Sequence, residues 1–280
     1  MAADSRVTIT AQAPPGLFNL PPGPGGQPPV VVLPATYDNA TKLLHFPGRK
    51  VGVITFGTGT IGLLPKHQPR TASSFVTEFE QTLPPVPKAG EAGEELSTEE
   101  FARRLGSFFL ERWKDGGMPT PVPKGGDMIF YVAGFTGDEP IGRLYELSVP
   151  SHPEPTEQQK GVLGGIWGGQ REIVDRIVQG FDPNVLGFTL SELKQTLSEA
   201  EQKALYEKMR NKFGQPIPWP LLPLQDCVNV AVFLVKATIS VQGWSFGLRG
   251  VGGAVDVATI TRSAGFQPVV IKEIRIEREL

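Results

Sequence analysis

The first twelve residues of this chain constrain its fold more than any other stretch. Val7, Ile9 and Ala11 alternate with polar residues, and this period of two predicts a half-buried strand that starts almost at the first residue. The first residues of a domain are usually poorly ordered unless a strand ties them into a sheet. A strand at this position therefore predicts that the N-terminal residues are held inside a sheet. Asp4 and Arg6 would project from one face of that strand, where two opposite charges are more often a solvated pair than a functional site.

The composition predicts a single folded domain over residues 1–280. Apolar residues make up 40% of the chain and charged residues 20%, which is typical of a globular protein with a sizeable core. A formal net charge of −2 provides no basic field for nucleic acid or an acidic membrane surface. No uninterrupted apolar run reaches the roughly 18 residues of a membrane span. We therefore expect neither nucleic acid nor a membrane among its partners.

The leading residues and the cysteine usage predict a cytoplasmic protein. Neither a basic segment nor an apolar segment of the kind found in secretory signals precedes Asp4. Cys227 is the single cysteine, so no internal disulfide can form, and this fits a reducing compartment.

Alternating and helical apolar patterns divide the domain into strands followed by helices. A Pro/Gly tract at 13–29 predicts a surface loop insertion, and residues 151–156, which hold two prolines, are expected to form a loop. Residues 189–212 are predicted to form one long polar helix within a helical elaboration near 183–222, and Cys227 is expected to be buried in the helix that follows. The predicted strands are 1–12, 30–33, 42–46, 51–56, 128–135, 141–149, 255–260 and 269–276, and the predicted helices are 71–83, 97–114, 171–179, 189–212 and 224–241.

Two common site patterns are rejected on their context. Residues 57–62 match Gly-x-Gly-x-x-Gly, but Pro65 follows where a dinucleotide fold needs the first turns of a helix. His45, His67 and His152 have no partners at metal-ligand spacing. We expect no cofactor and no metal.

An ordered set of short segments resembles the proteasome family of N-terminal-nucleophile hydrolases. Residues 2–8, which read Ala-Ala-Asp-Ser-Arg-Val-Thr, resemble the family's second strand. Residues 41–44 resemble its lysine-bearing strand, residues 51–59 the strand after it, and residues 130–135 and 252–258 two later strands. The resemblance implies an α+β fold of four layers (αββα), with two antiparallel sheets between helical layers.

The resemblance also implies a threonine-type amide hydrolase. In this family the first mature residue attacks the amide and its own α-amino group accepts the proton; that amino group titrates at about 7.7–8.0, which suits a general base. By similarity, Lys42 would be the ammonium beside the nucleophile, Asp4 would pair with Lys42, and Arg6 would brace the same strand. Without a nucleophile, the same charges would form only a structural ion network.

A glycine-rich segment before the predicted helix at 171–179 is the expected place for substrate. By similarity, Gly164, Gly165, Gly168 and Gly169 would let a peptide approach the nucleophile. Close packing of a helix on a sheet explains the same glycines equally well.

The family's nucleophile would open a strand just before residue 2, and no such strand is present among the 280 residues. We expect either that the true start lies upstream, which makes this sequence inactive as given, or that the chain is a non-catalytic structural subunit of a homo-oligomeric ring or dimer. Residues 248–251 also depart from the family, because they lack the acidic residue and the serine that often precede its Gly-Gly pair. The usual polar support of the nucleophile's amino group is therefore not expected here. Peptides are the expected substrates, with small amides as an alternative, because a fold does not determine a substrate.

Overall fold

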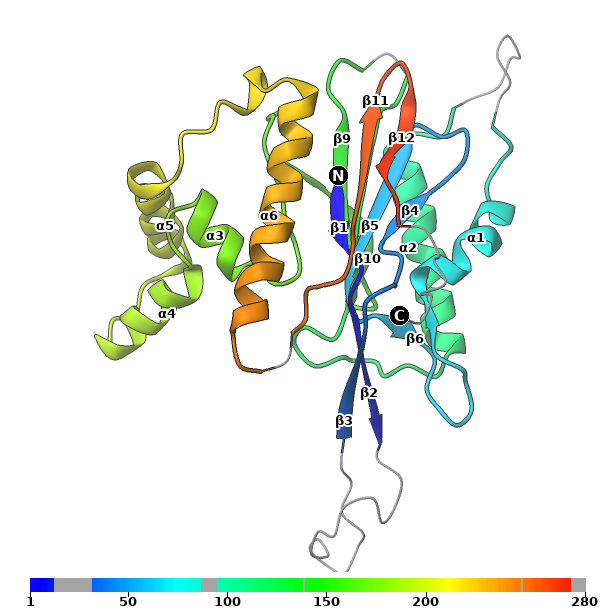
Figure 1. The fold of residues 1–280 in the computed structure, drawn as a ribbon, viewed down its shortest axis with the longest axis horizontal. Helices are drawn as coiled ribbons and strands as arrows, with labels where there is room; N and C mark the ends of the chain where they lie inside the picture. The colour runs from blue at the N-terminus through cyan, green and yellow to red at the C-terminus, as the bar shows by residue number, and fades with distance from the viewer. Residues whose placement is uncertain (13–31, 87–94, 138, 248, 273–280) are drawn as a thin grey trace, which may run out of the picture.

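The computed structural model describes residues 1–12, 32–86, 95–137, 139–247 and 249–272. Its centre is a five-stranded sheet in the order β10-β9-β8-β5-β4, in which every neighbouring pair is antiparallel (Figure 1). The short strand at 42–46 and the strands at 51–56, 128–135 and 141–149 are confirmed to within a few residues. The strands are β4 (Leu43–His45), β5 (Val51–Gly57), β8 (Met128–Gly134), β9 (Arg143–Val149) and β10 (His152–Gln158).

A second antiparallel sheet of three strands packs against the first. Its order is β1 (Ala2–Asp4), β11 (Val255–Thr261) and β12 (Gly265–Val270). At Gly52 in β5 the two sheets are so close that an added Cβ would lie 2.8 Å from the ring of Phe266 and 2.9 Å from Ile260. The glycine therefore permits the close approach of the sheets.

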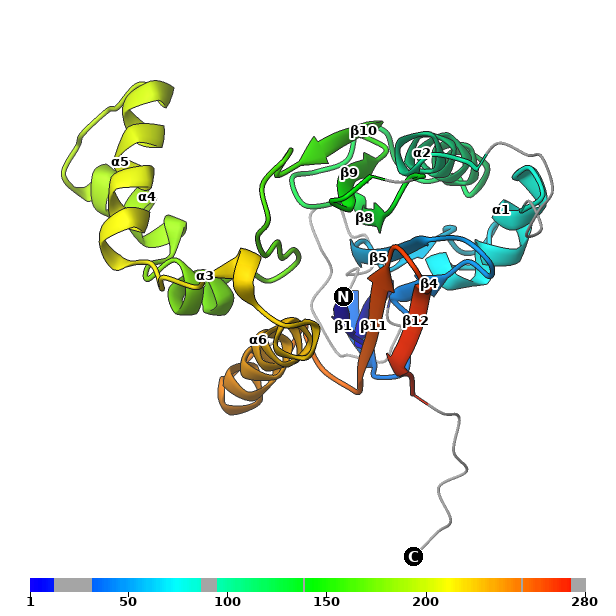
Figure 2. The ribbon, with the colours of Figure 1, turned by 90° about the horizontal axis from the view of Figure 1, so that it is seen from above.

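Helices lie on both sides of the two sheets: α1 (Val76–Thr82) and α2 (Thr98–Asp115) next to the five-stranded sheet, and α6 (Leu224–Trp244) beside β1 of the three-stranded sheet (Figure 2). The main core lies under α2, which packs on β8, β9 and β10, and α1 lies beside it. Ser97 caps α2 by accepting a hydrogen bond from the Glu100 N–H. On the other side, α6 lies against β1 and β11. The predicted αββα sandwich is confirmed. The core beneath α2 is rich in aromatic residues, among them Phe46, Phe79, Phe101, Phe109, Trp113 and Phe130.

The opening stretch forms two strands in different sheets, and the prediction of one continuous strand is wrong. After β1 the chain leaves the three-stranded sheet, and β2 (Val7–Gln12) pairs with β3 (Val32–Tyr37) in a two-stranded ribbon (Figure 1). The break falls at Ser5 and Arg6. Ser5 is fully buried, and its N–H and hydroxyl donate hydrogen bonds to the carbonyls of Gly252 and Ala254. Contacts with residues far along the chain therefore override the local alternation. The predicted insertion at 13–29 lies outside the described residues.

Two further expectations need correction. Residues 152–158 form β10 rather than a loop; β10 is an edge strand, where prolines are tolerated because one side of the strand needs no hydrogen-bond partner. Residues 189–212 are split between α4 (Pro183–Glu192) and α5 (Glu199–Phe213). Lys194 between them has φ +52°, and Ser198 and Glu201 form a capping box that starts α5.

The helical elaboration lies to one side of the sandwich. Helix α3 (Glu172–Val178) packs on α6 and leads into α4, and residues 214–223 lead from α5 back to α6 (Figures 1 and 2). None of the residues of α4 or α5 is buried. The remaining short elements are β6 (Thr60–Ile61), β7 (Arg70–Thr71) and two 3-10 turns at Ala72–Phe75 and Trp219–Leu221.

Helix α6 is more exposed than its sequence suggests. Only Leu234 and Thr238 are buried, and Cys227 is exposed, so the prediction of a buried cysteine is wrong. By length and composition α6 could span a membrane, and 11% of its most apolar stretch is buried. The expectation that no membrane is involved therefore stays a prediction.

Candidate active site

Lys42 and Asp4 form an ion pair where the two sheets meet. Asp4 is the last residue of β1 in the three-stranded sheet, and Lys42 directly precedes β4 at the edge of the five-stranded sheet. The Lys42 Nζ lies 2.8 Å from Asp4 Oδ1, and their side chains are 17% and 13% exposed. The structure thus brings together the two residues that the resemblance pairs.

The second carboxylate oxygen of Asp4 is held by the backbone. Asp4 Oδ2 accepts hydrogen bonds from the N–H groups of Arg6 and Gly252, each at 3.1 Å. The carboxylate therefore has three donors from three separate segments, and its orientation toward Lys42 is determined. A carboxylate that is held in this way can position an ammonium without moving itself.

Arg6 binds Asp38 rather than the Asp4–Lys42 pair. Its Nε lies 2.5 Å from Asp38 Oδ1 and its Nη2 lies 2.8 Å from Asp38 Oδ2, which is a two-point contact. The hydrogen bond from Arg6 lowers the pKa of Asp38, and the same bond raises the pKa of Arg6. Arg6 therefore braces the start of β2 against the end of β3. Asp38 could not be identified from the sequence alone, because its only signal there is a polar residue just after a strand.

A glycine turn completes the arrangement. A Cβ on Gly252 would overlap the guanidinium of Arg6, and a Cβ on Gly253, whose φ is +73°, would overlap the carbonyl oxygen of Asp38. The turn can therefore donate its backbone N–H to Asp4 only because both residues lack side chains. Buried Ser5 also holds this turn in place, because it donates hydrogen bonds to the carbonyls of Gly252 and Ala254.

Beside this site, β1 is an edge strand. Within the described part of the chain it pairs with β11 alone, with Ala3 opposite Asp256. Near Met1 there is a cavity of about 260 Å³, lined by the end of β8, the start of β9, the first turn of α6 and residues of β11. The other edge of β1 is therefore free to pair with a further strand, and open space lies at its Met1 end.

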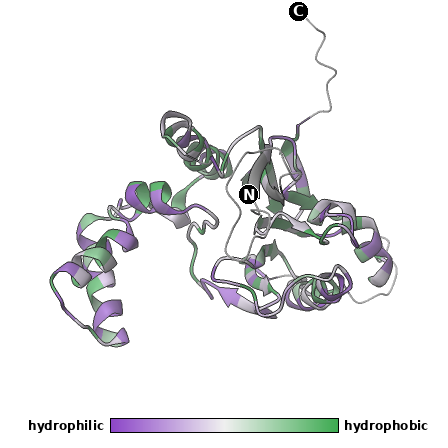
Figure 3. Ribbon diagram, turned by 90° about the horizontal axis from the view of Figure 1, so that it is seen from below, coloured by the Kyte–Doolittle hydropathy of each residue, from purple (hydrophilic) through white to green (hydrophobic). Residues whose placement is uncertain are grey.

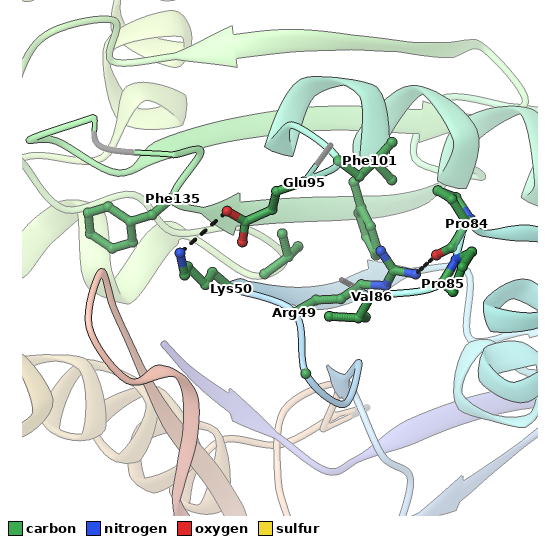
Figure 4. A pocket seen from close by; sticks show the side chains of 11 residues that line it. Arg49, Lys50, Pro84, Pro85, Val86, Glu95, Phe101 and Phe135 are labelled. Carbon is green, nitrogen blue, oxygen red and sulfur yellow. Dashed lines mark hydrogen bonds and ion pairs between the residues drawn. The ribbon is translucent and has the colours of Figure 1, made fainter. Parts of the chain in front are cut away.

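A second hollow is too small for a substrate. It lies between the start of β5 and the start of α2, where Arg49 donates to the carbonyl of Pro84 at 2.6 Å and Lys50 lies 3.4 Å from Glu95 (Figure 4). Its volume of about 20 Å³ is enough for a water molecule and little more.

The glycine-rich segment is mainly packed against aromatic rings. A Cβ on Gly168 would overlap the ring of Phe56, and one on Gly165 would lie 2.9 Å from Trp219. Gly164 approaches the Gln159 side chain, and Gly169 has φ +79°.

Neighbouring residues anchor this segment to α3 and bring it close to the glycine turn. Trp167 donates its Nε1–H to buried Asp175 in α3 at 2.9 Å, and Tyr131 donates to the Trp167 carbonyl at 3.3 Å. In the described residues no hydrogen bond or ion pair joins the segment to Asp4 or Lys42. A Cβ at Gly250 would, however, overlap the side-chain amide of Gln170, so the segment lies next to the turn that holds Asp4.

No family model matches the chain, and no curated protein sequence is significantly similar to it. Among solved structures, it is similar to "Anbu (ancestral beta-subunit) from Yersinia bercovieri", with 15% sequence identity and a TM-score of 0.43. The superposition covers 96% of this chain and 81% of that one. At this degree of overlap the likeness says nothing about activity or partners.

Proposed function

We propose that this chain is the body of an N-terminal-nucleophile amide hydrolase that acts on peptides, and that the sequence as given is inactive because the strand bearing the nucleophile is missing. One observation carries the proposal: the Asp4–Lys42 ion pair, at 2.8 Å and largely buried, lies at the end of an edge strand that is free to accept another strand. An isolated structural ion pair would not need a free strand edge beside it.

The direction of β1 determines where a nucleophile would lie. A preceding strand joined to Met1 by a tight turn would run antiparallel to β1 along its free edge. Its first residue would then come level with Asp4, the last residue of β1, and so lie next to Lys42. The ammonium of Lys42 would lower the pKa of a hydroxyl nucleophile there, and the α-amino group of the same residue would accept its proton.

Substrate binding by the glycine-rich segment is the less supported part of the proposal. Aromatic packing already accounts for Gly165 and Gly168. A Cβ on Gly164 would meet only the flexible side chain of Gln159, and a Cβ on Gly169 would make only ordinary van der Waals contacts with Phe56. These two glycines are therefore the better candidates to face a peptide.

A non-catalytic structural subunit is a second candidate, and a different observation favours it. Large apolar side chains on α4 and α6, such as Phe188 and Trp244, are more than half exposed. Such surfaces are typical of subunits that associate.

The test begins with the codons upstream of Met1. If they encode in frame a strand that starts at Thr, Ser or Cys, the longer protein should hydrolyse a peptide amide reporter, and Lys42→Met should reduce turnover by at least about 100-fold while the fold is retained. Lys50→Met is the matched control, because Lys50 forms an exposed pair with Glu95 away from the site. An in-frame stop directly upstream, or equal turnover in the Lys42→Met variant, would overturn the proposal.

A further inference from the structure

The helical elaboration carries an apolar surface that the other described residues leave exposed. Helix α4 contains Val185, Leu186, Phe188 and Leu190 within ten residues, yet none of its residues is buried. An isolated helix that is apolar on most sides is normally covered by other protein. Figure 3 shows α4 and α5 away from the sheets, so the chain's own core does not cover them. We define the α4 surface by two exposed large side chains of α4, Val185 (53% exposed) and Phe188 (66%), and by Leu193 (64%), which directly follows the helix.

A second uncovered surface lies on α6. Phe233 and Trp244 are eleven residues apart, or about three helical turns, so they lie on the same face of the helix. The buried residues Leu234 and Thr238 lie about 100–140° around the helix from Phe233, so Phe233 and Trp244 lie outside the face that packs on β1 and β11. Lys236 lies one turn from Phe233 on the same exposed side. We define the α6 surface by Phe233 (56% exposed), Trp244 (81%) and the fully exposed Phe246 that follows the helix.

We propose that these two surfaces bind each other between copies of this chain, so that the α4 surface of each copy packs on the α6 surface of the other in a two-fold dimer. This inference is independent of the hydrolase proposal. In such a dimer each copy contributes both surfaces, as two-fold symmetry requires.

The exposed area matches what a stable dimer needs. Taken together, the two surfaces expose on the order of 800 Å² of large apolar side chain per copy, and this is about the area that one partner contributes to a standard interface. Either surface alone is about the size of the largest apolar patch on an ordinary monomer.

Few charges would need to be desolvated on docking. Glu192 is the one charged residue of α4, and Asp226 and Lys236 are the two of α6. Aromatic side chains with few charges around them are typical of the centre of a protein interface. A membrane-binding helix instead carries several Lys or Arg residues on its polar face, so a second protein copy is the favoured occupant.

The proposal is tested by measuring the mass of the native chain by light scattering during size-exclusion chromatography. The parent chain is expected to be a dimer. Phe188→Asp and Trp244→Asp should each weaken association by at least about 100-fold, because each places a charge at the centre of both contacts. Leu63→Asp is the matched control: Leu63 is also exposed but lies before β7, away from both helices, and this variant should remain a dimer.

Mixing the two variants identifies the pairing. Phe188→Asp has an intact α6 surface and Trp244→Asp an intact α4 surface, so a mixture should associate more strongly than either variant alone. If α4 bound α4, or α6 bound α6, one of the two variants would remain a dimer by itself, and that result would overturn the proposed pairing. Phe246→Ser, at a fully exposed position, replaces Trp244→Asp if the latter does not fold.

Three other outcomes would also overturn the proposal. The first is a parent chain that is monomeric at about 100 µM, a concentration far above the dissociation constant of a standard interface. The second is an assembly larger than a dimer. The third is a monomer that binds phosphatidylcholine–phosphatidylserine vesicles through Trp244.

Discussion

Lys42 and Asp4 belong to different sheets, yet the ammonium of one lies 2.8 Å from the carboxylate of the other. The pair therefore connects the two layers at one end of the sandwich. Its acidic member also receives two backbone N–H groups, so the segments that contain Arg6 and Gly252 depend on the same carboxylate.

Removing that carboxylate should destabilise the protein more than removing a typical surface charge. Asp4→Ala leaves the Lys42 ammonium and two backbone N–H groups without their acceptor, and we expect a loss of about 3 kcal/mol in the free energy of unfolding. Glu95→Ala, which breaks the exposed pair with Lys50, should cost less than about 1 kcal/mol. Urea unfolding of both variants checks this. Equal losses would show that the Asp4 pair is no more than a surface contact.

Asp38 should contribute a small stabilisation that disappears in acid. Arg6 lowers the pKa of Asp38 in the folded protein, so the contribution is fully present above the unfolded pKa of about 3.9 and is lost as the pH falls through the lower folded value. Because the Asp38 side chain is 47% exposed, we expect at most about 1 kcal/mol. The stability difference between the parent and Asp38→Asn, measured from pH 7 to pH 2.5, should shrink below about pH 4. A difference that grows in acid would contradict this assignment.

Tyr131 should make the protein sensitive to alkali. Burial raises its pKa to about 12, so between its unfolded value of about 10 and 12 the folded state holds a proton that the unfolded state has released. Stability therefore falls as the pH rises through this window, by up to about 2–3 kcal/mol. Tyr131→Phe should lose less stability between pH 9 and pH 11, and ultraviolet titration should show that the last tyrosine to ionise is gone. If that late step persists in Tyr131→Phe, another tyrosine is responsible.

Two glycine-to-alanine changes inside helices should have opposite effects. A Cβ at Gly106 in α2 would overlap the backbone carbonyl of Pro153 in β10, so Gly106→Ala should destabilise the protein by about 1–3 kcal/mol despite its better helix propensity. Gly187 in α4 has open space where its Cβ would lie, and Gly187→Ala should stabilise the protein by about 0.4–1 kcal/mol. Thermal unfolding distinguishes the two. A stabilising Gly106→Ala would mean that β10 packs less closely on α2 than the structure describes.

The strands and the aromatic helix at 97–114 could be predicted from sequence because their periodic signals need only a few neighbouring residues. The four-layer arrangement and the Asp4–Lys42 pair were implied only by the family resemblance of segments such as 2–8 and 41–44. The break between β1 and β2 could not be predicted in this way, because it depends on hydrogen bonds from Ser5 to residues about 250 positions away.

The same reason explains the partner of Arg6. Asp38 lies 32 residues further along the chain and has no distinguishing pattern around it. The division between α4 and α5 is a different case: Ser198 and Glu201 have the spacing of a capping box, but the polar pattern of residues 189–212 continues across the break and hides it. Whether Asp4 and Lys42 act in catalysis stays a prediction.

The absence of buried residues in α4 and α5 has a consequence for the life of the protein in a cell. Segments with few buried contacts open first, and proteases cleave the open form. For a lone copy, turnover would therefore begin in these two helices while the sandwich remained intact. A second copy docked on α4 would protect that helix, so the abundance of the protein would depend on its own concentration.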